Sequence, residues 1–334
     1  MAGDDLTEFA RDGEAARWHY RPDHPVALNP VFDWPPRPMA VLRWYARYWL
    51  ALTSSTITIA VAIAAYFVLL PPLEEMQTWR AGWMMRVYLA NFIPHVTVAG
   101  VLHMWLYHWR GQGTSFKFDP RDLARSNGTF TFGNQIHDNM FWTIASGITQ
   151  WTAAQWIVFW AMANGYAPQA LFPGNPVWFV LAFPFLVAWS SFHFYWVHWL
   201  LHWPPLYKRA HALHHRNVNV GPWSGISMHP LEHLLFYTNF AIHFVVPSHP
   251  IHVLFHGYMQ SVHPVLSHSG FDQLQVADKT RAKMGDFFHQ PHHRYFECNY
   301  GTVEVPWDRW FGTFHDGSEA ATRATRARKT QMYT

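Results

Sequence analysis

Histidines at helical spacing are the residues of this chain best suited to chemistry. Sixteen of its twenty-four histidines lie between residues 198 and 293. An H-x-x-x-H pair comes first, and two H-x-x-H-H motifs and one H-P-L-E-H motif follow it. Residues four apart share one face of a helix, so each of these motifs can aim two imidazoles at one point. Imidazole binds iron, zinc, copper and nickel, which makes a metal site the leading interpretation.

The number of grouped histidines indicates two metal ions rather than one. Each buried imidazole needs partners for two ring nitrogens, so packing alone explains such a concentration poorly. The candidate ligands are His198, His202, His211, His214, His215, His229, His233, His263, His268, His289, His292 and His293. Five further histidines lie outside these motifs and are expected on helix surfaces or behind the ligands: His243, His249, His252, His256 and His315.

Two carboxylates accompany the histidine motifs. Glu232 lies between His229 and His233, and Asp286 lies three residues before His289. Either carboxylate could accept an N–H from a ligand histidine and so fix its tautomer. Either could instead cap a helix. For Glu232 the supporting role behind a ligand is favoured.

The composition is typical of a membrane protein. Of the 334 residues, 50% are hydrophobic, 18% are aromatic and only 13% are Asp, Glu, Lys or Arg. That charged fraction is about half of the usual value for soluble proteins. A single cysteine, Cys298, excludes a disulfide framework and a cysteine-based zinc or iron–sulfur site. The net charge of +3 is too small to indicate a nucleic-acid partner.

Four stretches free of Asp, Glu, Lys and Arg are long enough to cross a bilayer. They are residues 48–70, 87–107, 141–163 and 176–201. Basic residues gather before the first stretch, between the second and third, and after the fourth. The positive-inside tendency then places both termini and the histidine motifs on the cytoplasmic side of a bacterial inner membrane or an endoplasmic reticulum membrane.

The expected fold is an all-α integral membrane protein, with about four transmembrane helices and a cytosolic helical cap that carries a His-rich dimetal site. Residues 1–40 are expected as a cytosolic N-terminal segment and residues 41–175 as the first three spans with their connections. Residues 176–315 form the predicted catalytic domain, and residues 316–334 a mobile basic tail. Residues 234–246 and 251–266 are apolar but too short to span, and are predicted to be interfacial or re-entrant helices.

The ordered motifs YWVHWLLH, PPLYKRAHALHH, HPLEH, HSG, HQPHHRYFECNYG and WDRWFGT resemble the fatty acid hydroxylase/sterol desaturase superfamily. The resemblance extends from about Trp189 to Thr313. It places ligands at His198, His202, His211, His214, His215, His268, His289, His292 and His293, with His229, His233 and His263 as further candidates. Many members have Arg and Asp where this chain has Trp199 and Ser191, which leaves the subfamily and the substrate open.

The resemblance implies a monooxygenase-type enzyme that uses two iron ions and O₂ to hydroxylate or desaturate a C–H bond of a lipid, either a sterol or a fatty-acyl chain. Zinc can replace iron on overexpression, because imidazole binds both metals. The chain contains no Gly-rich nucleotide fingerprint. Electrons are therefore expected from a ferredoxin, a cytochrome or an NAD(P)H-dependent reductase.

A His-rich membrane metal transporter and a zinc-dependent hydrolase are the alternatives. A transporter needs ligands distributed across the bilayer, whereas these histidines gather after the last predicted span. The H-E-x-x-H motif of many zinc hydrolases is absent. The sequence leaves open hydroxylation or desaturation, the position oxidised and the oligomeric state.

Overall fold

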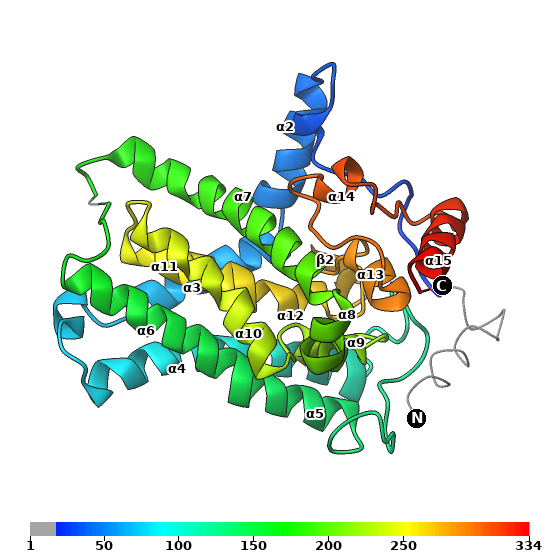
Figure 1. The fold of residues 1–334 in the computed structure, drawn as a ribbon, viewed down its shortest axis with the longest axis horizontal. Coiled ribbons are helices and arrows are strands. Elements are labelled where there is room, and N and C mark those ends of the chain that lie inside the picture. The colour runs from blue at the N-terminus through cyan, green and yellow to red at the C-terminus, as the bar shows by residue number, and fades with distance from the viewer. Residues whose placement is uncertain (1–17, 171, 334) are drawn as a thin grey trace.

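The computed structural model describes residues 18–170 and 172–333, and most of them are helical (Figure 1). The α-helices are α2 (Pro38–Tyr45), α3 (Ser54–Val68), α4 (Ala81–His103), α5 (Gln135–Trp142), α6 (Thr149–Ala163), α7 (Pro176–Leu201), α8 (Pro204–Leu206), α9 (Ala212–His215), α10 (Pro230–Tyr237), α11 (Pro250–Ser261), α12 (His263–Ser267), α13 (His289–Tyr295), α14 (Trp307–Trp310) and α15 (Glu319–Tyr333). Single π-helical segments are η2 (Ala46–Leu50), η4 (Met104–His108), η5 (Thr143–Ile148) and η6 (Tyr207–His211). Short 3₁₀ segments are η1 (Pro30–Phe32), η3 (Leu73–Met76), η7 (Pro222–Ser224) and η8 (Thr238–Phe244).

The long helices run roughly along the long axis of the molecule, and the histidine motifs gather toward one end (Figure 1). Helix α7 begins where the side chain of Asn175 accepts a hydrogen bond from the Trp178 amide, with Pro176 at the first helical position. Both features favour a helix start. The helix then continues to Leu201 and so carries His198 to that end of the molecule.

Two helices are long and apolar enough to cross a membrane among the residues that the structure describes. They are Ala81–His108, which joins α4 and η4, and Pro176–Leu201, which is α7. These correspond to the predicted spans 87–107 and 176–201. Predicted span 141–163 lies within a longer helical run over α5, η5 and α6. That run is not apolar enough to count as a candidate membrane span. Four crossings are therefore not confirmed.

The predicted span 48–70 is wrong as a single helix. The chain leaves helical geometry at Ala51 and restarts at Ser54, where Thr53 and Thr56 form a reciprocal capping box. A capping box satisfies backbone N–H groups at a helix start, so it favours a new helix at this point. The remaining apolar helix, α3, has 15 residues.

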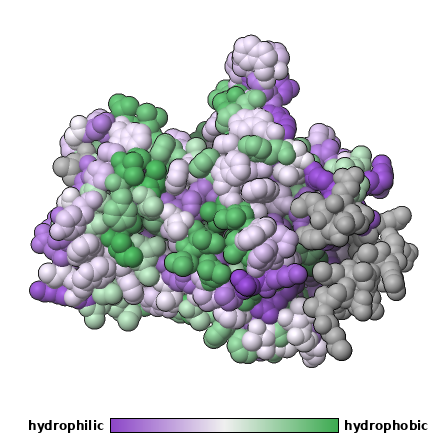
Figure 2. Space-filling view, viewed as in Figure 1, coloured by the Kyte–Doolittle hydropathy of each residue, from purple (hydrophilic) through white to green (hydrophobic). Residues whose placement is uncertain are grey.

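Much apolar surface stays exposed on the long helices. On α7, Val177, Val180 and Leu181 are more than half exposed, and α3 leaves Phe67 and Val68 about three-quarters exposed. Figure 2 shows apolar residues gathered over the left half and the centre of the viewed face, where Figure 1 places α7 and α6. Apolar surface of this extent is typical of contact with a membrane or a partner.

The two shorter apolar segments pack inside the molecule. Helix α11 contacts α3, α6 and α7, and its Val253, Leu254 and Tyr258 are fully buried. An interfacial helix with an exposed apolar face is therefore not what α11 forms, because neighbouring helices cover it on several sides, and a re-entrant helix at 251–266 stays a prediction. Residues 234–246 divide between α10 and η8, where Leu234 and Val245 are exposed but Phe236 and Phe240 are buried.

The C-terminal third adds a β-hairpin to the helical fold and ends in a helix. Strands β1 (Gln273–Val276) and β2 (Lys279–Lys283) form an antiparallel hairpin. The tail is helix α15, whose Arg328 donates hydrogen bonds to the carbonyls of Glu297 and Gly312. These contacts hold the basic tail against the chain that follows the last histidine motif.

Candidate metal centre

The first two ligands lie where α7 ends. His198 is in the last turn, and His202 follows as the C-cap, with its backbone N–H bonded to the His198 carbonyl. Both side chains are buried although α7 leaves most of its apolar surface exposed. The sequence thus brings two imidazoles inward from the end of a helix whose other faces are apolar.

The first H-x-x-H-H motif follows a π-helical segment. Residues Tyr207–His211 form η6, and α9 continues through His214 and His215. Single π-turns inside helices are frequent at functional sites. His211, His214 and His215 are all buried. The second H-x-x-H-H motif forms α13, where His289, His292 and His293 are likewise buried.

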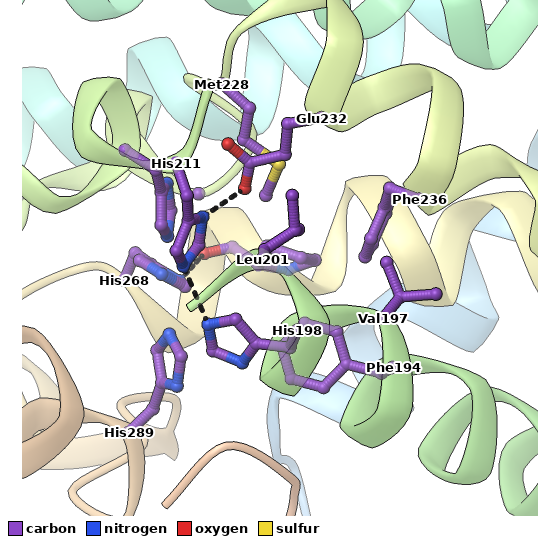
Figure 3. A pocket seen from close by; sticks show the side chains of 13 residues that line it. Phe194, Val197, His198, Leu201, His211, Met228, Glu232, Phe236, His268 and His289 are labelled. Carbon is purple, nitrogen blue, oxygen red and sulfur yellow. Dashed lines mark hydrogen bonds and ion pairs between the residues drawn. The ribbon is translucent and has the colours of Figure 1, made fainter. Parts of the chain in front are cut away.

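Nine of the twelve predicted ligands converge into two groups. The five-histidine group consists of His198, His202, His211, His215 and His292, and the four-histidine group of His214, His268, His289 and His293. Within each group, one ligand nitrogen per residue lies within 4.8 Å of all the others. Figure 3 shows rings from both groups facing the space between α7, η6 and α13.

The two H-x-x-H-H motifs are shared between the groups in opposite ways. In the first motif the outer pair, His211 and His215, joins the five-histidine group, and His214 joins the other. In the second motif the outer pair, His289 and His293, joins the four-histidine group, and His292 crosses over. Neighbouring helix residues point about 100° apart, so adjacent histidines naturally serve different ions. This arrangement places the two sites side by side.

The distances within the groups fit metal ligation. The Nε2 atom of His211 lies 3.1 Å from the Nε2 atoms of both His198 and His202, and the Nε2 atoms of His215 and His292 are 3.0 Å apart. Metal–nitrogen bonds are about 2.1 Å long, so two ligands at right angles lie about 3.0 Å apart. In the four-histidine group, His293 Nε2 lies 3.1 Å from His289 Nε2 and 3.2 Å from His268 Nε2.

Hydrogen bonds at the opposite ring nitrogen decide which nitrogen carries the proton. The Nδ1 of His198 lies 2.7 Å from the Tyr300 carbonyl, and the Nδ1 of His292 lies 2.7 Å from the Cys298 carbonyl. A carbonyl only accepts, so each Nδ1 is the donor and each Nε2 of these neutral rings has a free lone pair. His211 is held in the same way, because its Nδ1 lies 2.7 Å from Glu232 Oε1.

Unprotonated Nε2 atoms cannot hydrogen-bond to one another. His198 and His211 both direct a lone pair across their 3.1 Å separation, and no proton is left to bridge it. Such a cluster is stabilised when a cation accepts those lone pairs. The residues therefore fit a pair of imidazole-bound metal ions. Burial adds to this fit, because it lowers the pKa of His211 to about 3 and of His214 to about 4, which keeps both rings neutral at pH 7.

The two predicted carboxylates have different positions. Glu232, on α10, is buried and accepts the N–H of ligand His211, as Figure 3 shows. Burial raises the pKa of Glu232 to about 7, and the neighbouring His214 and His229 act in the opposite direction. Asp286 instead accepts a hydrogen bond from the Phe288 amide at 2.9 Å, just before α13. Asp286 thus supports the start of the helix that carries three ligands.

Three predicted ligands lie outside both groups. His229 is the N-cap of α10, and its Nδ1 accepts the Leu231 amide. His233 has both ring nitrogens engaged, with Ser146 Oγ and the Ile226 carbonyl, while His263 contacts Ser54 Oγ at 3.0 Å. These three histidines therefore do not lie with the other nine.

For the five histidines outside the motifs, the expected position is on a helix surface or behind the ligands, and burial argues against the surface position. His243, His252, His256 and His315 are fully buried, and His249 is half-buried. His243 Nε2 lies 2.9 Å from His256 Nδ1, and His315 Nε2 lies 3.0 Å from Thr322 Oγ1. These hydrogen bonds satisfy ring nitrogens inside the molecule, and sequence spacing does not reveal such partners.

Sequence reasoning missed the segment Glu297–Tyr300 as a support of the site. Glu297 Oε1 lies 4.0 Å from His202 Nδ1, and Glu297 Oε2 accepts a 2.5 Å hydrogen bond from the Tyr300 hydroxyl. The Cys298 and Tyr300 carbonyls orient two ligands, as described above. Glu297 could have been noticed as a carboxylate close after the last motif, but backbone carbonyls leave no sequence signal.

Cavities reach the metal ligands from the side of His268 and His289. A small cavity of about 50 Å³ is lined by apolar side chains that include Val197, Leu201 and Met228 (Figure 3). A larger cavity of about 650 Å³ shares its walls through Phe194, Phe236, Pro264, His268 and His289. Of the two short apolar segments, 234–246 contributes Phe236 to the cavity walls, and 251–266 contributes Met259, Gln260, His263 and Pro264.

Comparisons with known proteins agree with the histidine motifs. Residues 183–313 match the fatty acid hydroxylase family. The chain is 29% identical over 161 residues to the Delta(7)-sterol 5(6)-desaturase erg3B of Aspergillus fumigatus, a match that covers 47% of each protein. It is 31% identical over 121 residues to the Delta(7)-sterol 5(6)-desaturase ERG3 of Saccharomyces cerevisiae, covering 36% of this chain and 32% of that enzyme.

A relative from an animal is named differently. Methylsterol monooxygenase 1 of Gallus gallus is 33% identical over 143 residues, covering 41% of this chain and 48% of the relative. The chain spans about half the length of the curated relatives it matches, or less. No solved structure matches it. The resemblance to the fatty acid hydroxylase/sterol desaturase superfamily is confirmed for the part that holds the ligands.

Proposed function

We propose that this chain, as a relative of sterol desaturases and fatty acid hydroxylases, is a membrane-bound di-iron enzyme that hydroxylates or desaturates a lipid with O₂. The observation that carries the proposal is the convergence of nine buried histidines into two adjoining groups. Their Nε2 lone pairs face one another without protons between them where Nδ1 is held by a fixed acceptor.

Iron fits both the donor set and the reaction. No side chain can oxidise an unactivated C–H bond, so bound iron ions and O₂ would supply that oxidising power. Hydroxylation combines R–H, O₂, two electrons and two protons into R–OH and one water. Desaturation uses the same inputs, removes two hydrogens from the lipid and yields two waters. Either outcome requires an external electron donor, for which a ferredoxin, a cytochrome or an NAD(P)H-dependent reductase qualifies.

The chain's own residues orient the ligands and shield the centre. The Tyr300 and Cys298 carbonyls hold His198 and His292, and Glu232 holds His211. Fixed tautomers avoid reorganisation when a metal ion binds. Burial of all nine ligands limits the access of water to the reacting atoms.

A lipid is the substrate that the cavities favour. Phe194 and Phe236 line both cavities and connect the larger one to the ligands His268 and His289. Burial against these apolar side chains contributes about 0.8 kcal/mol per methylene, so the part of a lipid near the ligands gains affinity without an ionic contact. Charged side chains such as Arg47 and Asp272 line other parts of the larger cavity. The sterol names of the relatives make a sterol the first substrate to test.

The exposed apolar surface of α7, α4 and α3 supports membrane embedding. We infer that α7 approaches the cytoplasmic side at its C-terminal end, because basic residues follow it in the sequence. The metal centre would then lie at the cytoplasmic interface. A metal transporter is less well supported, since the converging ligands gather at one end of the helices rather than along a path across them.

The test is lipid analysis of cells that express the full chain. We expect wild-type protein to convert a cellular lipid into a product with one added oxygen atom or two fewer hydrogens, and purified protein to hold two metal ions per chain. A matched His292→Ala strain should lack the product. A lipid profile identical in the two strains, from a sterol-containing host with two metal ions bound per wild-type chain, would contradict the proposed function.

A further inference from the structure

Two aromatic rings contact the five-histidine group, and neither ring lines a cavity. The Tyr207 ring centroid lies 5.5 Å from that of His202 and 5.7 Å from that of His215. The Phe296 ring centroid lies 4.9 Å from that of His215. Tyr207 and Phe296 are both half-buried, so each ring contacts ligands on one side and reaches solvent on the other. The ligands of this group are therefore one side chain away from the surface here.

Phe296 is held in place by an unusual backbone turn. Its φ of 71° and ψ of −50° are close to those of the classic γ-turn, and the Glu297 amide donates to the Tyr295 carbonyl at 2.9 Å. This turn is rare and strained for a residue with a side chain. Backbone strain of this kind persists where the surrounding structure enforces it, and it concentrates at functional sites. The turn directs the Phe296 ring onto ligand His215.

Basic residues flank the two rings. Lys208 and Arg209 are exposed beside Tyr207 on η6. From α15, Lys329 Nζ lies 4.8 Å from the Phe296 ring centroid, and Arg326 lies 5.9 Å from that of neighbouring Tyr295. The nearest carboxylate in sequence, Glu297, is buried and bonded to Tyr300. The surface over the rings therefore carries positive charge.

This surface is separate from the cavities proposed for the lipid. Tyr207, Phe296 and the basic residues line neither cavity, whereas His268 and His289 line both. A molecule bound over Tyr207 and Phe296 would thus leave the lipid in place. The reaction needs that separation, because electrons must reach the centre while substrate is bound.

We propose that Tyr207, Lys208, Arg209, Phe296, Arg326 and Lys329 form a carrier face that docks an acidic one-electron carrier protein. The inference rests on the proposed function, since only a redox enzyme needs such a partner. Each docked carrier gives up one electron and leaves oxidised, so two carriers supply the two electrons that one O₂ requires. Complementary charge speeds encounter and orients the partner, while the two rings bring the carrier's cofactor close to the ligands.

An anionic membrane surface is the other occupant that such charges attract. Exposed aromatic residues suited to a membrane interface lie on α7 and α14, at Trp199 and Trp310, and another, Trp203, precedes η6. The carrier face is centred instead on the rings that touch metal ligands. This position favours a redox protein over lipid head groups.

The test measures binding of an acidic plant-type [2Fe–2S] ferredoxin to the full chain in nanodiscs of neutral phosphatidylcholine. Lys208→Glu with Arg209→Glu reverses two charges of the face. Lys279→Glu with Arg281→Glu makes the same change on the exposed hairpin and is the matched control. We expect the first pair to weaken binding by about tenfold or more at low salt, and the control to stay within about twofold of wild type.

A second pair of substitutions lies away from the first H-x-x-H-H motif, which Lys208 and Arg209 closely precede. Arg326→Glu with Lys329→Glu alters α15, far in sequence from the histidines, and should weaken binding similarly while metal content stays at the wild-type level. With dithionite as a small reductant, the metal centres of both double variants should be reduced at the wild-type rate. Equal ferredoxin affinity in wild type and both pairs, or a loss that appears only in nanodiscs with anionic lipid, would overturn the carrier face.

The two proposals fail in distinguishable ways. If the ferredoxin binds the wild type and the face variants lose that binding, the carrier face stands even when no lipid product forms. If a lipid product forms but the face variants bind ferredoxin and are reduced by it as the wild type is, the proposed function stands and the carrier face is wrong.

Discussion

Replacing Glu232 tests the link between ligand orientation and metal affinity most directly. Glu232 Oε1 lies 2.7 Å from His211 Nδ1, and both side chains are buried. This hydrogen bond keeps the proton on Nδ1 and leaves Nε2 facing His198 and His202. Glu232→Ala removes the acceptor, whereas Glu232→Gln keeps a neutral acceptor oxygen in nearly the same shape.

The expected loss follows from the supporting role of the carboxylate. Removing such partners of ligand histidines typically lowers metal affinity by about 10- to 100-fold. That range corresponds to about 1.4–2.7 kcal/mol of binding free energy. A buried Nδ1–H left without an acceptor costs about 1–3 kcal/mol, which is consistent with the same range. We therefore expect affinity to fall in the order wild type, Glu232→Gln, Glu232→Ala.

The loss should be confined to one of the two ions. The hydrogen bond of Glu232 goes to His211 of the five-histidine group, while the four-histidine group has its own hydrogen bond from His268 Nδ1 to the Pro264 carbonyl at 3.0 Å. Titration against a chelator of known affinity should thus show one weakened and one nearly unchanged ion. Exposed Glu74→Gln is the control for the loss of a negative charge.

Thermal unfolding of the metal-free variants separates folding from binding. If Glu232→Ala is folded and still binds two ions as tightly as wild type, the argument from the His211 tautomer is wrong. If both ions weaken equally in a folded variant, the two groups do not act as separate sites.

Three further outcomes test the site. His292→Ala should lose about one metal ion per chain, which elemental analysis will check. His229→Ala should keep both ions and lose only about 1 kcal/mol of stability, because it removes a helix cap, and unfolding will check this. Val197→Phe should fill the small cavity and lower turnover of bulky lipids with metal content unchanged; an unaltered product profile would contradict the assigned cavity. Burial lowers the pKa of His211 to about 3 and of His214 to about 4, so the unfolded chain binds more protons than the folded chain below pH 6.5. The stability of the metal-free protein should therefore fall as the pH drops from about 6.5 toward 4. A flat unfolding midpoint over that range would contradict the burial of these rings.

The nine histidines of the two groups could be singled out from the sequence because their spacing is a local property. Residues four apart, such as His198 and His202, must share a helix face whatever surrounds the helix. The same reasoning located α7 and the helix over residues 81–108, since a long apolar stretch without charges has few other stable conformations. Glu232 was also predictable as a partner, because it lies within a histidine motif.

The local sequence pattern is a poor guide where tertiary contacts compete with it. His229 and His233 have ligand-like spacing, but a cap bond and two hydrogen bonds engage their ring nitrogens instead. The apolar run 48–70 looked continuous, yet the Thr53 capping box divides it. Helix α11 is short enough to suggest an interfacial position, but α3, α6 and α7 surround it.

The sequence by itself thus determined that candidate histidine ligands come in helical motifs and that the helices around them are apolar. Only the tertiary structure decided how the ligands divide into two groups, because that division depends on the packing of α7, η6, α12 and α13 against one another. It also decided which carbonyls and carboxylates hold each ring, as with Tyr300 behind His198 across 102 residues of chain. Spacing along a helix is set by backbone geometry, whereas contacts between distant segments depend on how the whole chain packs.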